Sequence, residues 1–400
     1  MSNPTPRASI KLPGDFTFGH VRPDHKKVDP TELPAPLGPL AAFVGDWVGN
    51  GFNTIFRPDN SVTPTPLPNP VPAPVPPATL DNILELNLTS ESLSFSPSLG
   101  SVPNRGTTPQ GDIFLNGVPY LQTVQDTTIH GESVGIHVEP GIWIHIPATT
   151  VPPINQETVA RMASIPHGTT IEAQGVFGSK DGPPTIDPVN ITPFVTGSNP
   201  QKLITFPSQT ATNANTPRIP QDLTSFIAAG TITQPLLDDP NSLLRSHISK
   251  QNIIKTVAIV ISTAPPPPPP PPTLFGGGTD NIAFLLGQPA ATAPNAQTLQ
   301  MTATFWIETV EEIIEVPPFT VGQAPFLIQA TPSVPGQSVP TFSITPPWDL
   351  DKPHKIKVHF TQIQYTQTVL LNFAGLTWPH VSVNTLVPAD DIIVPHSVWK

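Results

Sequence analysis

The chain of 400 residues contains 58 prolines and 26 glycines, whereas charged residues make up only 12% and cysteine is absent. Proline on this scale removes backbone donors and fixes φ, which excludes an all-helical bundle and a coiled coil. The lack of cysteine excludes disulfide scaffolds and thiolate metal sites, and a net charge of −11 without a basic cluster argues against nucleic-acid partners.

Hydrophobic residues make up 37% of the chain, which is enough for a folded core. The first residues lack the apolar run of a signal peptide, and no stretch of 18 apolar residues could form a membrane helix. We therefore expect a cytoplasmic protein without a membrane partner, built on one main core with inserted loops.

The N-terminal region is predicted to form an extended proline-rich arm at residues 1–40, followed by the first part of a barrel at residues 41–177. The first β-like segment, Phe43–Arg57, contains glycines of the kind that mark bulges or bends at a barrel corner. Residues 62–78 then read as a polyproline-like loop.

Strict alternation of apolar and polar residues begins after this loop and indicates half-buried strands. In residues 83–95, Leu84, Leu86 and Leu88 face one way, whereas Glu85, Asn87 and Thr89 face the other. Further strands are predicted at Asp112–Thr123, Val134–Ile146, Thr158–Ile165 and Thr169–Phe177. Short strands in this meander spacing favour an antiparallel sheet that closes.

Residues 178–298 interrupt the pattern and are predicted to form an insertion. It would contain a short helix at Asn241–Gln251 that caps the barrel mouth, a strand at Ile253–Ser262 and a polyproline loop at Pro265–Pro272. Residues 299–400 would supply the closing strands.

Strands in the last part of the chain are predicted at Asn281–Leu286, Leu299–Val310, Lys355–Phe373 and Thr377–Leu386, of which the 355–373 run would be one bent strand or two. The predicted fold is therefore all-β: a closed antiparallel barrel of about ten strands with long proline-rich loop insertions.

Histidines stand out among the residues that could carry chemistry, because the usual catalytic motifs are missing. His137, Glu139, Gly141, Trp143 and His145 share one face of a predicted strand. If that face lines a cavity, Glu139 could orient a histidine toward a ligand. An outward polar face or a structural His–Glu hydrogen bond is the alternative.

Two further histidines have distinct settings. His380 lies in an apolar strand, where a single imidazole could bind heme iron axially, although a satisfied buried histidine is the alternative. His167 lies in a turn between two strands, either in contact with a ligand at the barrel rim or solvated.

Three segments together resemble the nitrobindin family, which are heme-binding β-barrels of the calycin type. Gly45–Gly51 (GDWVGNG) is similar to the family's first strand, G-x-W-x-G-x-G. Ile136–Gly141 is similar to its apolar-H-x-E-x-G strand, and Pro379–Val383 resembles its last strand, which holds the axial histidine. The resemblance implies a ten-stranded barrel with heme at its mouth, His380 as the iron ligand, and nitric oxide binding linked to peroxynitrite isomerisation.

The leading functional hypothesis is a barrel that binds a hydrophobic or planar small molecule, with heme as the best single candidate. The expected cofactor contacts are Trp47, Trp143, His145 and His380, and the expected metal ligand is His380.

Two other functions remain open at this point. The chain could be a metal-free isomerase-like or lyase-like enzyme, with His137 or His167 as general base and Glu139 as its orienter. It could also be a non-catalytic interaction protein whose arm and polyproline loops dock partners.

Overall fold

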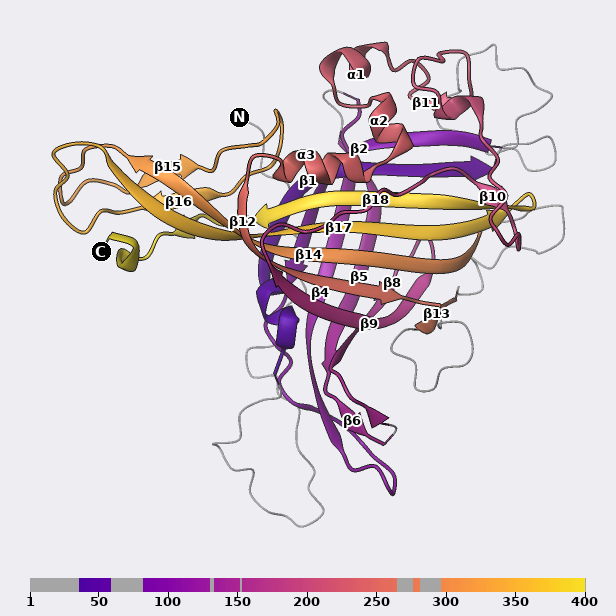
Figure 1. Ribbon diagram of the computed structural model, residues 1–400, viewed down its shortest axis with the longest axis horizontal. Helices are drawn as coiled ribbons and strands as arrows, with labels where there is room; N and C mark the ends of the chain where they lie inside the picture. Colours follow the sequence, from indigo (N-terminus) through magenta and orange to yellow (C-terminus); the bar gives the residue numbers. More distant parts are fainter. Residues whose placement is uncertain are drawn as a thin grey trace.

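Ten antiparallel strands form a closed barrel in the computed structural model (Figure 1). The structure describes residues 36–58, 82–129, 133–151, 153–264, 276–280 and 296–399. Hydrogen-bonded neighbours around the barrel run in the order β2, β1, β18, β17, β14, β12, β9, β8, β5, β4, and the pairing of β4 with β2 closes the ring. The prediction of an all-β antiparallel barrel of about ten strands is confirmed.

The barrel strands match most of the predicted segments. They are β1 (Gly45–Pro58), β2 (Asn82–Phe95), β4 (Ile113–Asp126), β5 (Val134–Ile146), β8 (Thr158–Ser164), β9 (Thr170–Asp181), β12 (Asn252–Ser262), β14 (Gln297–Val316), β17 (His354–Phe373) and β18 (Leu376–Pro388). The run predicted at Lys355–Phe373 as one bent strand or two is a single strand, β17. β12 lies within the predicted insertion but belongs to the barrel. The arm up to residue 35, both polyproline segments and the strand predicted at Asn281–Leu286 lie outside the described residues.

One end of the barrel is closed by a 3-10 helix, η1 (Gly38–Phe43), whose Leu40 and Phe43 are fully buried. The Phe43 ring lies 5.5 Å from the Trp143 ring and 6.2 Å from the Phe305 ring, between centroids. Trp47 belongs to the same cluster and donates its indole N–H to the Phe43 carbonyl over 2.7 Å. This aromatic plug fills the barrel interior at that end.

The glycines of β1 serve a different purpose from the predicted one. The pairing of β1 with β18 runs from Trp47 to Thr54 without a register shift, so no bulge separates the two strands there. A Cβ atom at Gly49 or Gly51 would instead lie 2.0 Å from a carbonyl oxygen of β18. These glycines therefore permit a close approach of two backbones.

The segment between β9 and β12 covers the outside of the barrel. It contains α1 (Thr224–Ala229), α2 (Gln234–Asp238) and α3 (Asn241–Ile248), which Figure 1 shows beside β1, β2 and β18. His247 Nδ1 of α3 lies 2.9 Å from Thr385 Oγ1 on β18, and Gln364 Nε2 of β17 donates to the Leu244 carbonyl. The predicted helix exists, but it lies against the barrel wall. The prediction that it caps the barrel mouth is wrong.

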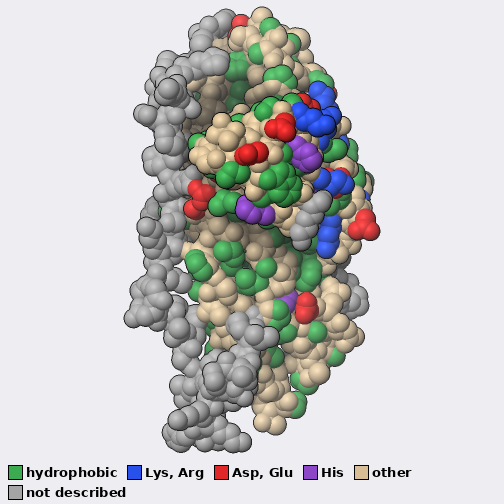
Figure 2. Space-filling view, turned by 90° about the vertical axis from the view of Figure 1, so that its left-hand side faces the viewer, with side chains coloured by type: hydrophobic (Ala, Val, Ile, Leu, Met, Phe, Trp, Pro, Cys, Tyr) green, Lys and Arg blue, Asp and Glu red, His purple; other side chains and the backbone are tan. Residues whose placement is uncertain are grey.

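β14 and β17 are each 20 residues long and extend beyond the barrel. An additional sheet covers this extension. That sheet consists of β15 (Phe326–Gln329), β16 (Thr341–Ile344) and β19 (Ile392–Ile393), followed by the 3-10 helix η4 (His396–Trp399). Its buried side supplies a third hydrophobic cluster that includes Phe342 and Trp399. Figure 2 shows this end of the molecule, where apolar side chains are exposed between charged ones.

The remaining short elements decorate the barrel. They are β3 (Val102–Asn104), the β6–β7 hairpin (Thr149–Thr150 and Pro153–Ile154), β10 (Phe194–Val195), β11 (Arg218–Ile219), β13 (Gly276–Asp280) and the 3-10 helix η2 (Pro207–Gln209). Among the described residues, no helix has the length and apolar character needed to cross a membrane.

Candidate functional site

A cavity of about 500 Å³ occupies the barrel interior at the end opposite the aromatic plug. Its wall is formed by side chains of β1, β2, β4, β5, β14, β17 and β18 and by the β8–β9 turn. The residues that matter for its chemistry are Gln122, His137, His167, Tyr365, Gln367 and His380. A cavity of this size in a barrel mouth is typical of a site for one small molecule.

β5 spans the interior from the plug to the cavity and shows which face of the strand points inward. Glu139, Trp143 and His145 are buried to at least 99%, whereas Val138 on the other face is 40% exposed. Because side chains alternate along a strand, the mixed face of β5 is the inner face. Gly141 lies on it too, and its missing side chain leaves room for the Tyr120 ring, which a Cβ would approach to 2.5 Å.

Three of the predicted ligand contacts lie at the closed end of the barrel. Trp47 and Trp143 pack in the aromatic plug. His145 Nδ1 lies 2.9 Å from the Pro36 carbonyl oxygen and its Nε2 lies 3.2 Å from a Glu157 carboxylate oxygen. Among the described residues that line the cavity, none of these three occurs. The structure thus gives them a place in closing the barrel, away from the cavity.

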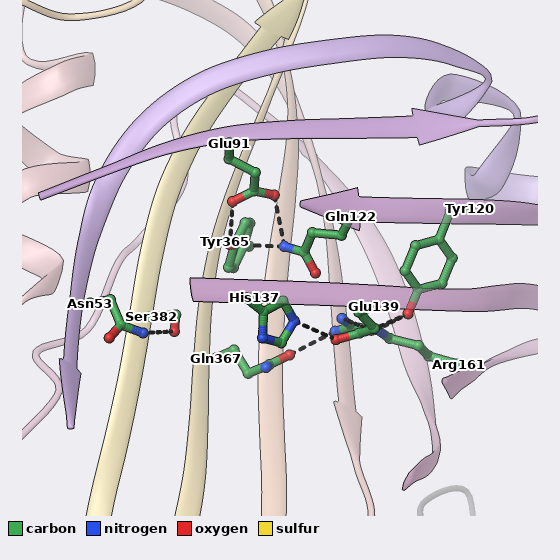
Figure 3. Close-up of polar contacts among 10 residues, drawn as sticks. All are labelled: Asn53, Glu91, Tyr120, Gln122, His137, Glu139, Arg161, Tyr365, Gln367 and Ser382. Carbon is green, nitrogen blue, oxygen red and sulfur yellow. Dashed lines mark hydrogen bonds and ion pairs between the residues drawn. The ribbon is translucent and has the colours of Figure 1, made fainter. Parts of the chain in front are cut away.

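Between plug and cavity lies a layer of hydrogen-bonded side chains, which we call the polar layer (Figure 3). It consists of Glu91, Tyr120, Gln122, Glu139, Arg161, Tyr365 and Gln367. These residues come from five strands, β2, β4, β5, β8 and β17. The polar layer forms the floor of the cavity, because Gln122, Tyr365 and Gln367 belong to both.

The ion pair of Glu139 and Arg161 is the charged centre of the polar layer. Arg161 Nη2 lies 2.5 Å from Glu139 Oε1, and Arg161 Nε donates to the Tyr120 hydroxyl oxygen over 2.8 Å. Burial opposes ionisation of Glu139, but the guanidinium charge and hydrogen bonds from His137 and Tyr120 outweigh it and lower its pKa to about 2. Glu139 is therefore a carboxylate at neutral pH.

Glu91 is a second buried carboxyl in the same layer, with partners that carry no charge. Its Oε2 accepts hydrogen bonds from the Tyr365 hydroxyl over 2.6 Å and from Asn384 Nδ2 over 2.8 Å, and its Oε1 accepts one from Gln122. Burial raises the pKa of Glu91 to about 7, because these bonds only partly offset the loss of solvation. Glu91 extends the polar face already visible in residues 83–95, which is the sequence signal that could have identified it.

The histidines predicted for β5 and for the β8–β9 turn meet at the cavity wall. His137 Nε2 lies 3.2 Å from Glu139 Oε2, and the ring centroids of His137 and His167 are 5.1 Å apart at 88°. Burial is the main cause that lowers the pKa of His167, and the neighbouring His137 lowers it further. Because Glu139 is ionised, its carboxylate accepts a hydrogen bond from the His137 Nε2–H.

His380 reaches the same cavity from β18, on the opposite wall. Its Nδ1 lies 2.9 Å from the Thr54 carbonyl oxygen, so the N–H at Nδ1 donates and Nε2 keeps its lone pair. Burial lowers the pKa of His380 to about 4, and the ring is neutral at physiological pH. A neutral imidazole with one nitrogen fixed by a carbonyl is the usual arrangement of a metal-binding histidine.

Comparison with known proteins adds little to this geometry. No protein-family profile and no curated protein matches the chain. One solved structure, the crystal structure of Rv2717c from M. tuberculosis, is similar at 9% sequence identity and a TM-score of 0.30, over 89% of this chain and 99% of that chain. A likeness this weak does not assign the chain to a family.

Proposed function

We propose that the protein binds a planar organic molecule in the barrel cavity, and that this molecule is heme with His380 as the iron ligand. The observation that carries the proposal is the fixed, neutral imidazole of His380, whose Nδ1 donates to Thr54 and whose Nε2 makes no hydrogen bond to the described residues.

Other residues that line the cavity support the proposal. Ile55, Val124 and Leu371 line the cavity and offer apolar contacts to a flat ring, whereas Arg57 at the wall is paired with Glu85. Among the described residues, no group of three or more His, Asp or Glu side chains converges as a metal site. A metal bound by His380 would therefore need to be one that a single protein ligand can hold, as heme iron is.

The resemblance to nitrobindins rests on three segments that all belong to barrel strands. Gly45–Gly51 belongs to β1, and β1 pairs with β18, which carries His380. Ile136–Gly141 belongs to β5 and brings His137 to the cavity. Bound heme would supply an iron centre for a diatomic molecule such as nitric oxide, and His137 and His167 are the side chains that could contact it.

Absorption spectroscopy tests the heme proposal. Titration of hemin into the purified full-length chain is expected to shift the Soret band, and His380→Ala is expected to abolish or alter the shift. His359→Ala, an exposed histidine on β17, is the matched control. An unshifted Soret band, or a shift that His380→Ala leaves unchanged, would refute heme binding through this histidine.

A second candidate function is favoured by the contact of His137 with Glu139. An ionised carboxylate that fixes one ring nitrogen of a histidine is the arrangement of a general base. In this version the cavity holds a small metabolite, and His137 Nδ1 accepts a proton from it in an isomerase-like or lyase-like reaction. Mass spectrometry of molecules that copurify with the chain would supply the substrate, and turnover that survives in His137→Gln would exclude the mechanism.

A further inference from the structure

The polar layer turns two side-chain amides toward the cavity, and each has one end fixed by the protein. Gln122 Nε2 donates to Glu91 Oε1 over 2.8 Å and to the Tyr365 hydroxyl oxygen over 3.2 Å. Gln122 is only 7% exposed and lines the cavity. Its carbonyl Oε1 accepts no hydrogen bond from the described residues, so it is a buried acceptor available to a ligand.

Gln367 is oriented in the opposite sense. Its Oε1 accepts a hydrogen bond from Arg161 Nη1 over 2.7 Å, and a guanidinium can only donate, so the amide cannot be turned round. Gln367 is 9% exposed and also lines the cavity. Its Nε2 makes no hydrogen bond to the described residues and is a buried donor available to a ligand.

Gln122 and Gln367 both belong to the polar layer that forms the cavity floor (Figure 3). Gln122 touches Tyr365, and Tyr365 and Gln367 lie two positions apart on the inner face of β17. Buried polar atoms of this kind need hydrogen-bond partners, and a site that contains them discriminates against ligands that cannot supply the partners.

We propose that Gln122 and Gln367 form a binding subsite for a planar molecule that carries both an N–H donor and a C=O acceptor, as a lactam does. The ligand N–H donates to Gln122 Oε1, and the ligand carbonyl accepts from Gln367 Nε2. The apolar body of the ligand lies against Val124 and Val369, which also line the cavity. This subsite goes beyond the heme proposal, because it does not involve His380.

Two probe molecules of nearly equal shape test the subsite without any mutation. 2-Quinolinone has the adjacent N–H and C=O groups, whereas 1-methyl-2-quinolinone lacks the N–H. Isothermal titration calorimetry on the full chain without hemin is expected to show at least about tenfold tighter binding of 2-quinolinone, because the methylated probe leaves Gln122 Oε1 unpaired.

Gln367→Glu tests the assigned donor with a gain of binding. The carboxylate keeps an acceptor for Arg161 but replaces the cavity donor by a second acceptor. The variant is expected to lose 2-quinolinone and to prefer protonated 2-aminoquinoline, which presents two adjacent donors. Gln125→Glu is the matched control, since its Oε1 accepts from Ser133 outside the cavity and the charge change is the same.

Several results would overturn the subsite. They are a wild-type chain that does not distinguish the two quinolinones, a Gln367→Glu variant with unchanged preference, and a Gln125→Glu variant that switches in the same way. None of these bears on hemin binding, which the Soret band reports separately. Calorimetry with the quinolinones and the Soret titration with hemin therefore test the two proposals separately.

Discussion

Two glutamates in the barrel interior have pKa values shifted in opposite directions, because only one of them faces a cation. Burial raises the pKa of both carboxyls. At Glu139 the guanidinium of Arg161 outweighs burial and the pKa falls to about 2, whereas the neutral donors around Glu91 only partly offset burial and its pKa rises to about 7. Arg161 also lies 5.6–5.7 Å from the ring centroids of Tyr120, Trp143 and Phe305, so it joins the polar layer to the plug. The charge of this one side chain decides whether Glu139 can serve as a carboxylate.

Arg161→Met is predicted to destabilise the chain strongly. The substitution leaves a buried carboxylate without a cation, which typically costs about 3–5 kcal/mol in the free energy of unfolding. Adding Glu139→Gln removes the uncompensated charge and is expected to recover part of the loss. Urea denaturation followed by circular dichroism measures both effects.

Arg57→Met is the matched control, because the side chain of Arg57 is 33% exposed in its pair with Glu85. A pair open to solvent contributes about 0–1 kcal/mol. If Arg161→Met cost no more than Arg57→Met, the ion pair would not be what stabilises the polar layer.

At the scale of the element, β2 shows what the sequence could and could not predict. Its alternation identifies the strand, but the ordinary rule places leucines inside and polar residues outside. In the barrel Leu84, Leu86 and Leu88 point outward, and Glu85, Asn87 and Glu91 point inward. The inversion depends on residues 183–248, which cover the outer face, and alternation within a strand carries no information about a cover so distant in sequence.

The same limit applies to the site. His137, Glu139 and His380 were recognisable because each lies in a local motif. Arg161 and Gln367 were not, because their role arises from contacts between β5, β8 and β17. Such contacts follow from the order of strands around the barrel, which the sequence did not specify.

Leu86→Ala is predicted to behave as a core mutation although Leu86 faces away from the barrel interior. Leu86 is fully buried beneath the outer layer, and removal of a buried leucine side chain costs about 2–5 kcal/mol. Val138→Ala on β5, also an outward position but 40% exposed, is expected to cost about 0.5 kcal/mol or less. Equal shifts of the two urea midpoints would show that the outer layer does not shield β2.

For the whole molecule, the dependence of stability on pH follows from buried groups that act in opposite directions. Burial raises the pKa of Glu91 to about 7 and of Glu308 to about 8, from an ordinary value of 4.5. Burial lowers the pKa of His247 and of His380 to about 4, from 6.5. The two carboxyls therefore stay protonated to a higher pH in the folded chain than in the unfolded chain. The two histidines stay protonated only to a lower pH in the folded chain.

We predict maximal stability between pH 4.5 and 6.5 and a decline toward pH 8. The stabilisation from Glu91 and Glu308 is lost as the pH rises from 4.5 through their folded values, whereas that from His247 and His380 is lost as the pH falls from 6.5 toward 4. The four effects nearly cancel between 4.5 and 6.5, and above 6.5 only the carboxyls act, which lowers the free energy of unfolding by ~2–3 kcal/mol up to pH 8. Glu308→Gln should flatten this decline in urea unfolding at pH 6.5 and 8, whereas Glu315→Gln, exposed on the same strand, should not. A chain more stable at pH 8 than at pH 6.5 would contradict the assignment of protons to these carboxyls.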